Sequence, residues 1–155
     1  MDSERVLKAV DGFIQLIEQE SSPDEAQLEL ALDELALASN FCTDFVFDER
    51  ELPDAPDLDQ VLIRDMIASK FPDYGMYNLP EDVADNLSET RLMLGSAHDD
   101  LQDIYRDLKE VKWTWEHNSV EDGLWHFHWG YDHHWGAHLR NLQWYLYNSR
   151  YEGSR

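Results

Sequence analysis

Apolar residues recur at helical spacing along most of the chain. In the first segment, Val6, Val10, Phe13 and Ile17 follow one another at intervals of three or four positions, which places them on one face of a helix. No segment alternates apolar and polar residues for long, as a half-buried strand does. Since prolines and glycines interrupt the helical pattern, it predicts helices over residues 3–20, 24–47, 57–70, 96–116 and 119–148.

The fold predicted from this pattern is all-α: a single-domain bundle of about five helices, the last two long and antiparallel. Ser96 with Asp99, and Ser119 with Asp122, have the spacing of capping boxes and mark the starts of the two long helices. The 155 residues are enough to bury one core without disulfides. Cys42 has no second cysteine to pair with, and its apolar neighbours favour a buried position.

The last predicted helix carries a well-defined apolar stripe. On a projection of about 100° per residue, His128 falls within this stripe, and the apolar residues that form it are Leu124, Trp135, Leu139, Leu142 and Leu146. Gly136 interrupts the helix at a cost of about 1 kcal/mol relative to alanine. We expect this glycine to permit the close approach of another helix.

The chain is strongly acidic. It contains 33 Asp and Glu against 12 Lys and Arg, a formal net charge of −21. Such a field repels phosphate and anionic lipid, so we expect no nucleic-acid or membrane binding. It favours a basic protein partner, although adaptation to high salt produces the same bias. With no export signal at the N-terminus and no apolar run long enough to cross a bilayer, we expect a cytoplasmic protein.

Histidines are concentrated in residues 124–139, which contain five of the seven in the chain. His134 and His138 lie four residues apart on one helical face, the spacing at which two imidazoles can share a metal ion. His126 and His133 fall on the opposite face, where we expect them to be exposed to solvent and to have no role.

Three aspartates form an acidic ridge on the first of the two long helices: Asp100, Asp103 and Asp107. Like charges one turn apart repel unless something positive lies among them, which here can be Arg106, Lys109, a basic group of a partner, the amides at the start of the helix or a metal ion. If the two long helices pack antiparallel, the ridge can face His134 and His138, and helical bundles assemble metal sites from such facing residues. The alternative is a structural cluster in which one of the two histidines is hydrogen-bonded to a carboxylate of the ridge.

Three segments resemble a known family of small bacterial proteins, domain of unknown function 5063. They are KFPDYGMYNL (70–79), DDLQDIYRDLKE (99–110) and HWGAHL (134–139). The resemblance implies an all-helical fold and supplies no activity. Val111 stands where a glycine is expected after the second motif, and the family pattern does not include His126, His128 or His133.

No complete catalytic set is present: Cys42 has no basic neighbour, and the chain lacks a nucleophile elbow and a phosphate-binding loop. We therefore expect a protein-binding module of the inhibitor or immunity type, acting on a basic partner without catalysis and without a cofactor. The alternative is a metal-binding helical bundle, or a metal-dependent enzyme, that holds a divalent ion with His134, His138 and the Asp100, Asp103 and Asp107 ridge. A third possibility is a stable scaffold whose acidity reflects only its environment.

Overall fold

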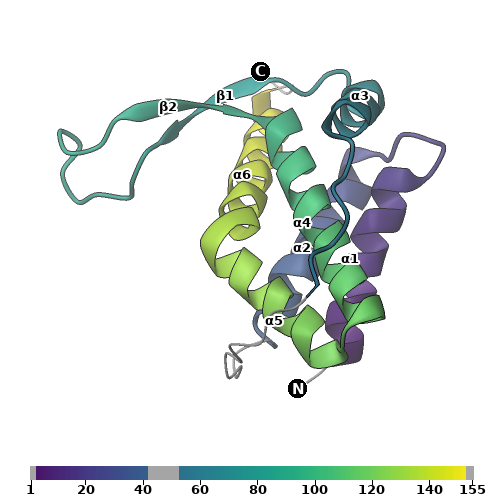
Figure 1. Cartoon of the computed structure of the whole chain (residues 1–155). Coiled ribbons are helices and arrows are strands. Elements are labelled where there is room, and N and C mark those ends of the chain that lie inside the picture. The colour runs from purple at the N-terminus through teal and green to yellow at the C-terminus, as the bar shows by residue number, and fades with distance from the viewer. Residues whose placement is uncertain (1–2, 42–52, 153–155) are drawn as a thin grey trace.

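The computed structural model describes residues 3–41 and 53–152, and most of them are helical (Figure 1). In chain order the elements are α1 (Ser3–Glu18), α2 (Glu25–Ser39), α3 (Gln60–Lys70), β1 (Met76–Pro80), β2 (Leu92–Ser96), α4 (Ala97–His117), α5 (Val120–Gly130), the π-helical turn η1 (Tyr131–Trp135) and α6 (Gly136–Glu152).

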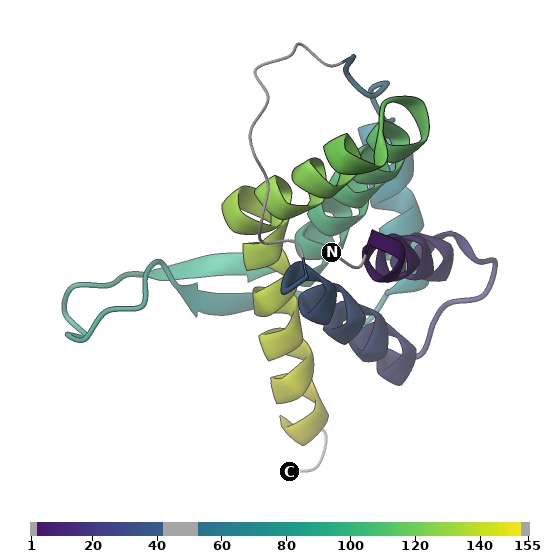
Figure 2. The same ribbon diagram turned by 90° about the horizontal axis from the view of Figure 1, so that it is seen from below.

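The expectation of an all-α chain is wrong for one segment. β1 and β2 pair antiparallel, with Met76 opposite Ser96 and Pro80 opposite Leu92, and the hairpin projects from the helical body as an arm (Figures 1 and 2). We call residues 76–96 the arm. The apolar run in β2 does not alternate with polar residues because both of its faces lie largely outside the core. Periodicity therefore gave no strand signal here.

Helix boundaries follow local capping chemistry. The Ser96 hydroxyl accepts a hydrogen bond from the Asp99 amide, and Ser119 does the same for Asp122, which confirms both predicted starts. The second predicted helix, 24–47, ends at Ser39 instead, with Asn40 as its cap. Residues 42–47 of that prediction, including Cys42, lie outside the described residues.

Helix α4 is the centre of the packing. It contacts α1, α3, α5, η1, α6 and β2, and its apolar stripe is buried among them. Two lysines on its outer side reach α1, where Lys109 pairs with Glu18 at 2.8 Å and Lys112 with Asp11 at 2.7 Å. The largest fully buried side chains come from α1, α2, α3, α4, α5 and η1: Phe13, Ile17, Leu28, Leu32, Leu35, Ile67, Leu101, Ile104, Leu108, Leu124, Phe127 and Trp135.

The last predicted helix is three joined segments, not one regular helix. Helices α5 and α6 are continuous through η1, in which the winding widens to the π form over five residues. The run packs on α4 with residues paired in reverse chain order: Gly123 lies against Trp115, His134 against Asp107, and His138 against Asp100.

The π turn explains Gly136, whose expected role as a contact point for another helix is wrong. A methyl group added at Gly136 would overlap the carbonyl oxygen of Tyr131 and lie 2.9 Å from its Cδ2 atom. The glycine is therefore required by its own helix. The turn also shifts the helical phase, so His128 is not in the buried stripe: it is half-buried, with Nε2 3.3 Å from an Asp132 oxygen.

Among the described residues, no helix is both long and apolar enough to cross a membrane.

Replacing Leu108 with alanine should lower the free energy of unfolding by about 2–5 kcal/mol, because this side chain is fully buried in the α4 stripe. Leu62→Ala is the matched control: Leu62 is 66% exposed on α3, so its loss should change stability by less than about 0.5 kcal/mol. Urea denaturation followed by circular dichroism measures both. Equal effects of the two substitutions would contradict the packing described above.

Two glycine-to-alanine changes should have opposite effects. Gly136→Ala should destabilise the protein by about 1–3 kcal/mol, because the methyl group has no room beside Tyr131. Gly12→Ala should stabilise it by about 0.5–1 kcal/mol, since Gly12 lies within α1 and an added methyl group meets nothing within 4 Å. Thermal unfolding compares the two variants, and a stabilising Gly136→Ala would rule out the steric role of the π turn.

Candidate metal centre

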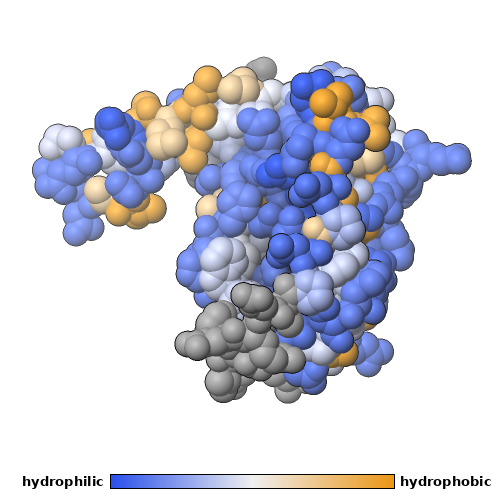
Figure 3. Space-filling view, in the orientation of Figure 1, coloured by the Kyte–Doolittle hydropathy of each residue, from blue (hydrophilic) through white to orange (hydrophobic). Residues whose placement is uncertain are grey.

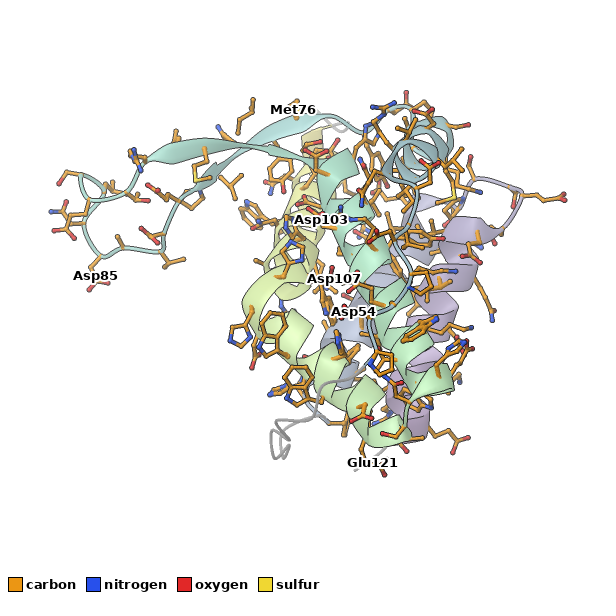
Figure 4. All side chains as sticks on the ribbon, in the orientation of Figure 1. Asp54, Met76, Asp85, Asp103, Asp107 and Glu121 are labelled. Carbon is orange, nitrogen blue, oxygen red and sulfur yellow. The ribbon has the colours of Figure 1, made fainter. Side chains whose placement is uncertain are left out.

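The five candidate residues lie together on the facing sides of α4 and the C-terminal helical run. Asp103 and Asp107 are on the side of α4 next to α6 (Figure 4), and Asp100 is one turn earlier. His134 is in η1, and His138 is in the first turn of α6. The expected juxtaposition of the acidic ridge with the two histidines is therefore present.

Each histidine is bonded to its own aspartate. The Nδ1 atom of His134 is 2.7 Å from an Asp107 oxygen, and Nδ1 of His138 is 2.8 Å from an Asp100 oxygen. Because a carboxylate only accepts hydrogen bonds, both Nδ1 atoms must carry the proton and donate it. In the neutral form of each ring, the lone pair is then on Nε2.

Asp103 completes a group of three possible ligands. One ring nitrogen of His134, one of His138 and one carboxylate oxygen of Asp103 all lie within 4.8 Å of one another. The Nε2 atom of His138 is 3.3 Å from the Asp103 oxygen Oδ2. Ligands at about 2.0–2.2 Å from a zinc ion are roughly 3–4 Å apart, so small side-chain adjustments bring the three onto one ion.

Asp100 is buried and fully engaged. Its side chain is only 6% exposed, and it accepts a hydrogen bond from the Tyr77 hydroxyl on β1 as well as the bond from His138. A buried carboxylate is costly unless donors surround it. The base of the arm therefore contributes to the site. There the Tyr77 ring also packs on the Tyr145 ring of α6, with the ring centroids 5.2 Å apart.

The other oxygen of Asp103 is held by Arg106, whose guanidinium also donates to Gln60 at 2.6 Å. This arginine brings a positive charge directly to the ridge. The ridge has three carboxylates, and this guanidinium pairs with one of them, so with neutral histidines the cluster keeps a negative charge that attracts a cation.

The pKa of His138 is raised above its ordinary value. The hydrogen bond to Asp100 is the largest cause; burial opposes it, and the charges of Asp103, Asp100 and Asp107 add to it. The carboxylates of the cluster thus stabilise a protonated His138.

A cavity of about 330 Å³ adjoins the cluster and is lined on one side by Asp107 and His134. His126 and His133, for which we expected no role, line it together with Trp129. The His133 ring stacks on Trp129 with ring centroids 4.8 Å apart. Neither histidine belongs to the group of three possible ligands, so both are separate from the centre itself.

Sequence patterns did not reveal Tyr77 as a member of the site. Arg106, three residues after Asp103 on α4, is one of the basic residues expected from the sequence to offset the ridge, and it pairs with Asp103. Tyr77 reaches Asp100 only through the hairpin, which the helical pattern does not predict.

Comparisons with known proteins agree with the fold. Residues 3–152 match the family described as Domain of unknown function (DUF5063). The crystal structure of protein BF1032 from Bacteroides fragilis superposes with a TM-score of 0.72 at 17% identity, covering 94% of this chain and 90% of that one. An identity that low establishes a shared fold alone. No curated protein matches the chain significantly.

Removing the buried carboxylate should lower the pKa of His138. In Asp100→Asn, measured by NMR titration with a chelator present, the His138 pKa should fall toward about 6.5, because its main hydrogen-bond acceptor loses its charge. Asp99→Asn removes the same charge from an exposed neighbouring position and should shift the His138 pKa much less.

The hydrogen bond between His138 and Asp100 also predicts how stability depends on pH. Since the folded pKa of His138 is raised, its bond to Asp100 contributes fully below the unfolded value of about 6.5 and is lost as pH rises through the folded value. The stability difference between wild type and Asp100→Asn should therefore be larger near pH 5.5 than near pH 8.5. A difference that grows with pH in the presence of chelator would show that His138 is not the responsible group.

Proposed function

The chain belongs to the DUF5063 family, and we propose that it binds a divalent transition-metal ion through His134, His138 and Asp103. The observation that carries this proposal is the convergence of two imidazoles and one carboxylate within 4.8 Å, from α4 and from the helical run that packs on it. Two histidines and one carboxylate are a recurrent ligand set for zinc and non-haem iron.

The hydrogen bonds behind the histidines support the proposal. Ligating histidines in proteins usually donate their second ring nitrogen to a carboxylate, which fixes the ring and strengthens the ligand. His134 and His138 each have such a partner, in Asp107 and Asp100. The five candidates thus divide into three ligands and two supporting acids.

The donor set favours some ions over others. Magnesium and calcium prefer oxygen ligands throughout, whereas imidazole nitrogen suits zinc, iron, cobalt, nickel and copper. Three protein ligands leave at least one coordination position for water or a substrate. His134 is the most accessible of the three, with 43% of its side chain exposed. A metal-dependent reaction at that open position is the enzymatic form of this proposal.

A protein-binding role is the second candidate, and the arm is the observation that favours it. Several large apolar side chains of the arm are exposed, among them Met76, Leu92 and Leu94. Together with a net charge of −21, they support recognition of a basic protein, as an inhibitor or immunity-type protein would require.

Untagged wild-type protein should bind one zinc or cobalt ion, and binding should weaken by at least about tenfold in His134→Ala and in His138→Ala, because each loses a ligand. His133→Ala is the matched control: it removes a histidine from the same turn whose ring stacks on Trp129, away from the centre. Calorimetry measures the affinity, and the visible spectrum of the cobalt complex reports nitrogen coordination.

Metal binding should strengthen as pH rises, because the ligands must be deprotonated. Chelator should then lower the melting temperature of metal-loaded wild type near neutral pH and leave the double variant His134→Ala, His138→Ala unchanged. If all three single variants bind zinc as wild type does, the cluster is a structural hydrogen-bond network and this function is excluded.

A further inference from the structure

The arm has one face whose apolar side chains are largely exposed to solvent. Side chains alternate across the hairpin, so Met76, Leu92 and Leu94 lie on the same face in the register of the two strands. They are 59%, 74% and 71% exposed. Figure 3 shows hydrophobic side chains along the arm, between hydrophilic ones.

The other face holds the arm to the body only at its base. There the Tyr77 hydroxyl donates to Asp100, and the Tyr77 ring contacts Tyr145. Gly95 makes room for this ring, because a methyl group at that position would lie 2.8 Å from the Tyr77 Cζ atom. Met76, Leu92 and Leu94 are therefore on the opposite face of the hairpin from Tyr77.

Both strands also have free edges. β1 and β2 have only each other as partners among the described residues. An isolated two-stranded hairpin is at best marginally stable in water, and a free apolar edge is a template for pairing with another strand. A third strand beside β2 would bring its side chains next to Leu92 and Leu94.

The charge of the arm indicates which strand fits. The segment that joins β1 to β2 carries Glu81, Asp82, Asp85 and Glu89. Its cation, Arg91, is already paired with Glu81 at 2.7 Å. A second copy of this chain would bring another charge of −21 to the interface, and its acids would repel these.

We infer that the arm binds a cationic protein by adding one of its strands at the edge of β2. Apolar residues of that strand contact Leu92 and Leu94, and its lysines or arginines pair with acids of the joining segment. This inference rests on the second function proposed above, and names the surface and the chemistry of the partner. It does not involve the metal centre.

The test uses two short fluorescent peptides with full-length protein. One peptide alternates lysine and valine, and the other alternates lysine and serine, so that they share a charge but only the first has an apolar face. The arm variant is Leu92→Ser with Leu94→Ser. Val61→Ser with Leu62→Ser is the matched control, because these residues are 53% and 66% exposed on α3.

Fluorescence anisotropy at moderate salt should show the lysine–valine peptide binding to wild type and to the α3 variant, and at least about tenfold more weakly to the arm variant. The lysine–serine peptide should bind all three weakly and equally. Circular dichroism of the arm variant should keep the helical signal of wild type, because both substituted side chains are outside the core.

Other outcomes distinguish strand addition at the arm from the more general binding of a basic protein. Equal binding of the lysine–valine peptide to all three proteins would overturn the inference. The proposal that the protein recognises a basic partner through its negative charge would then still stand. No binding of either peptide at low salt would overturn both. Sedimentation of wild type as a dimer, with the arm variant a monomer, would show that a second copy covers the arm and would also overturn the inference.

Discussion

The hydrogen bonds around one buried carboxylate, Asp100, hold three separate parts of the molecule in place. A charge taken out of water costs several kcal/mol unless donors replace the lost solvent, and the two donors that do so are Tyr77 and His138. One comes from the base of the arm and the other from α6. The position of the hairpin and the orientation of a candidate metal ligand therefore both depend on a single residue of α4.

Most of the helical architecture could be predicted from the sequence, because apolar spacing and capping residues act locally. The same reasoning predicts the candidate cluster, because residues three or four apart share a helical face. When the two neighbouring helices pack antiparallel, the ridge of three aspartates faces the pair of histidines. The structure places His134 against Asp107 and His138 against Asp100, which is the hydrogen-bonded arrangement expected for at least one of them.

The errors have physical causes that lie beyond local pattern. The π turn at Tyr131–Trp135 changes the helical phase, so a projection at constant angle cannot place residues on both sides of it; His128 was assigned to the wrong environment for this reason. The hairpin depends on contacts of Tyr77 with α4 and α6, and its strands of five residues each have too few apolar alternations to reveal themselves. Tyr77 reaches the site only because the hairpin forms, so a sequence pattern that does not predict the hairpin does not predict this residue either.

Ion pairs and hydrogen bonds between helices far apart in the sequence determine when the protein can fold during its synthesis. Lys112 of α4 pairs with Asp11 of α1 across 101 positions, and Gln143 of α6 donates to Asp33 of α2 across 110. Helices α1 and α2 can pack on each other as soon as they leave the ribosome, but their remaining apolar faces wait for partners synthesised some hundred residues later. The buried leucine and phenylalanine side chains of α1 and α2 are therefore exposed until α4 and α6 are synthesised, and a high density of carboxylates favours the solubility of this α1–α2 pair in the meantime.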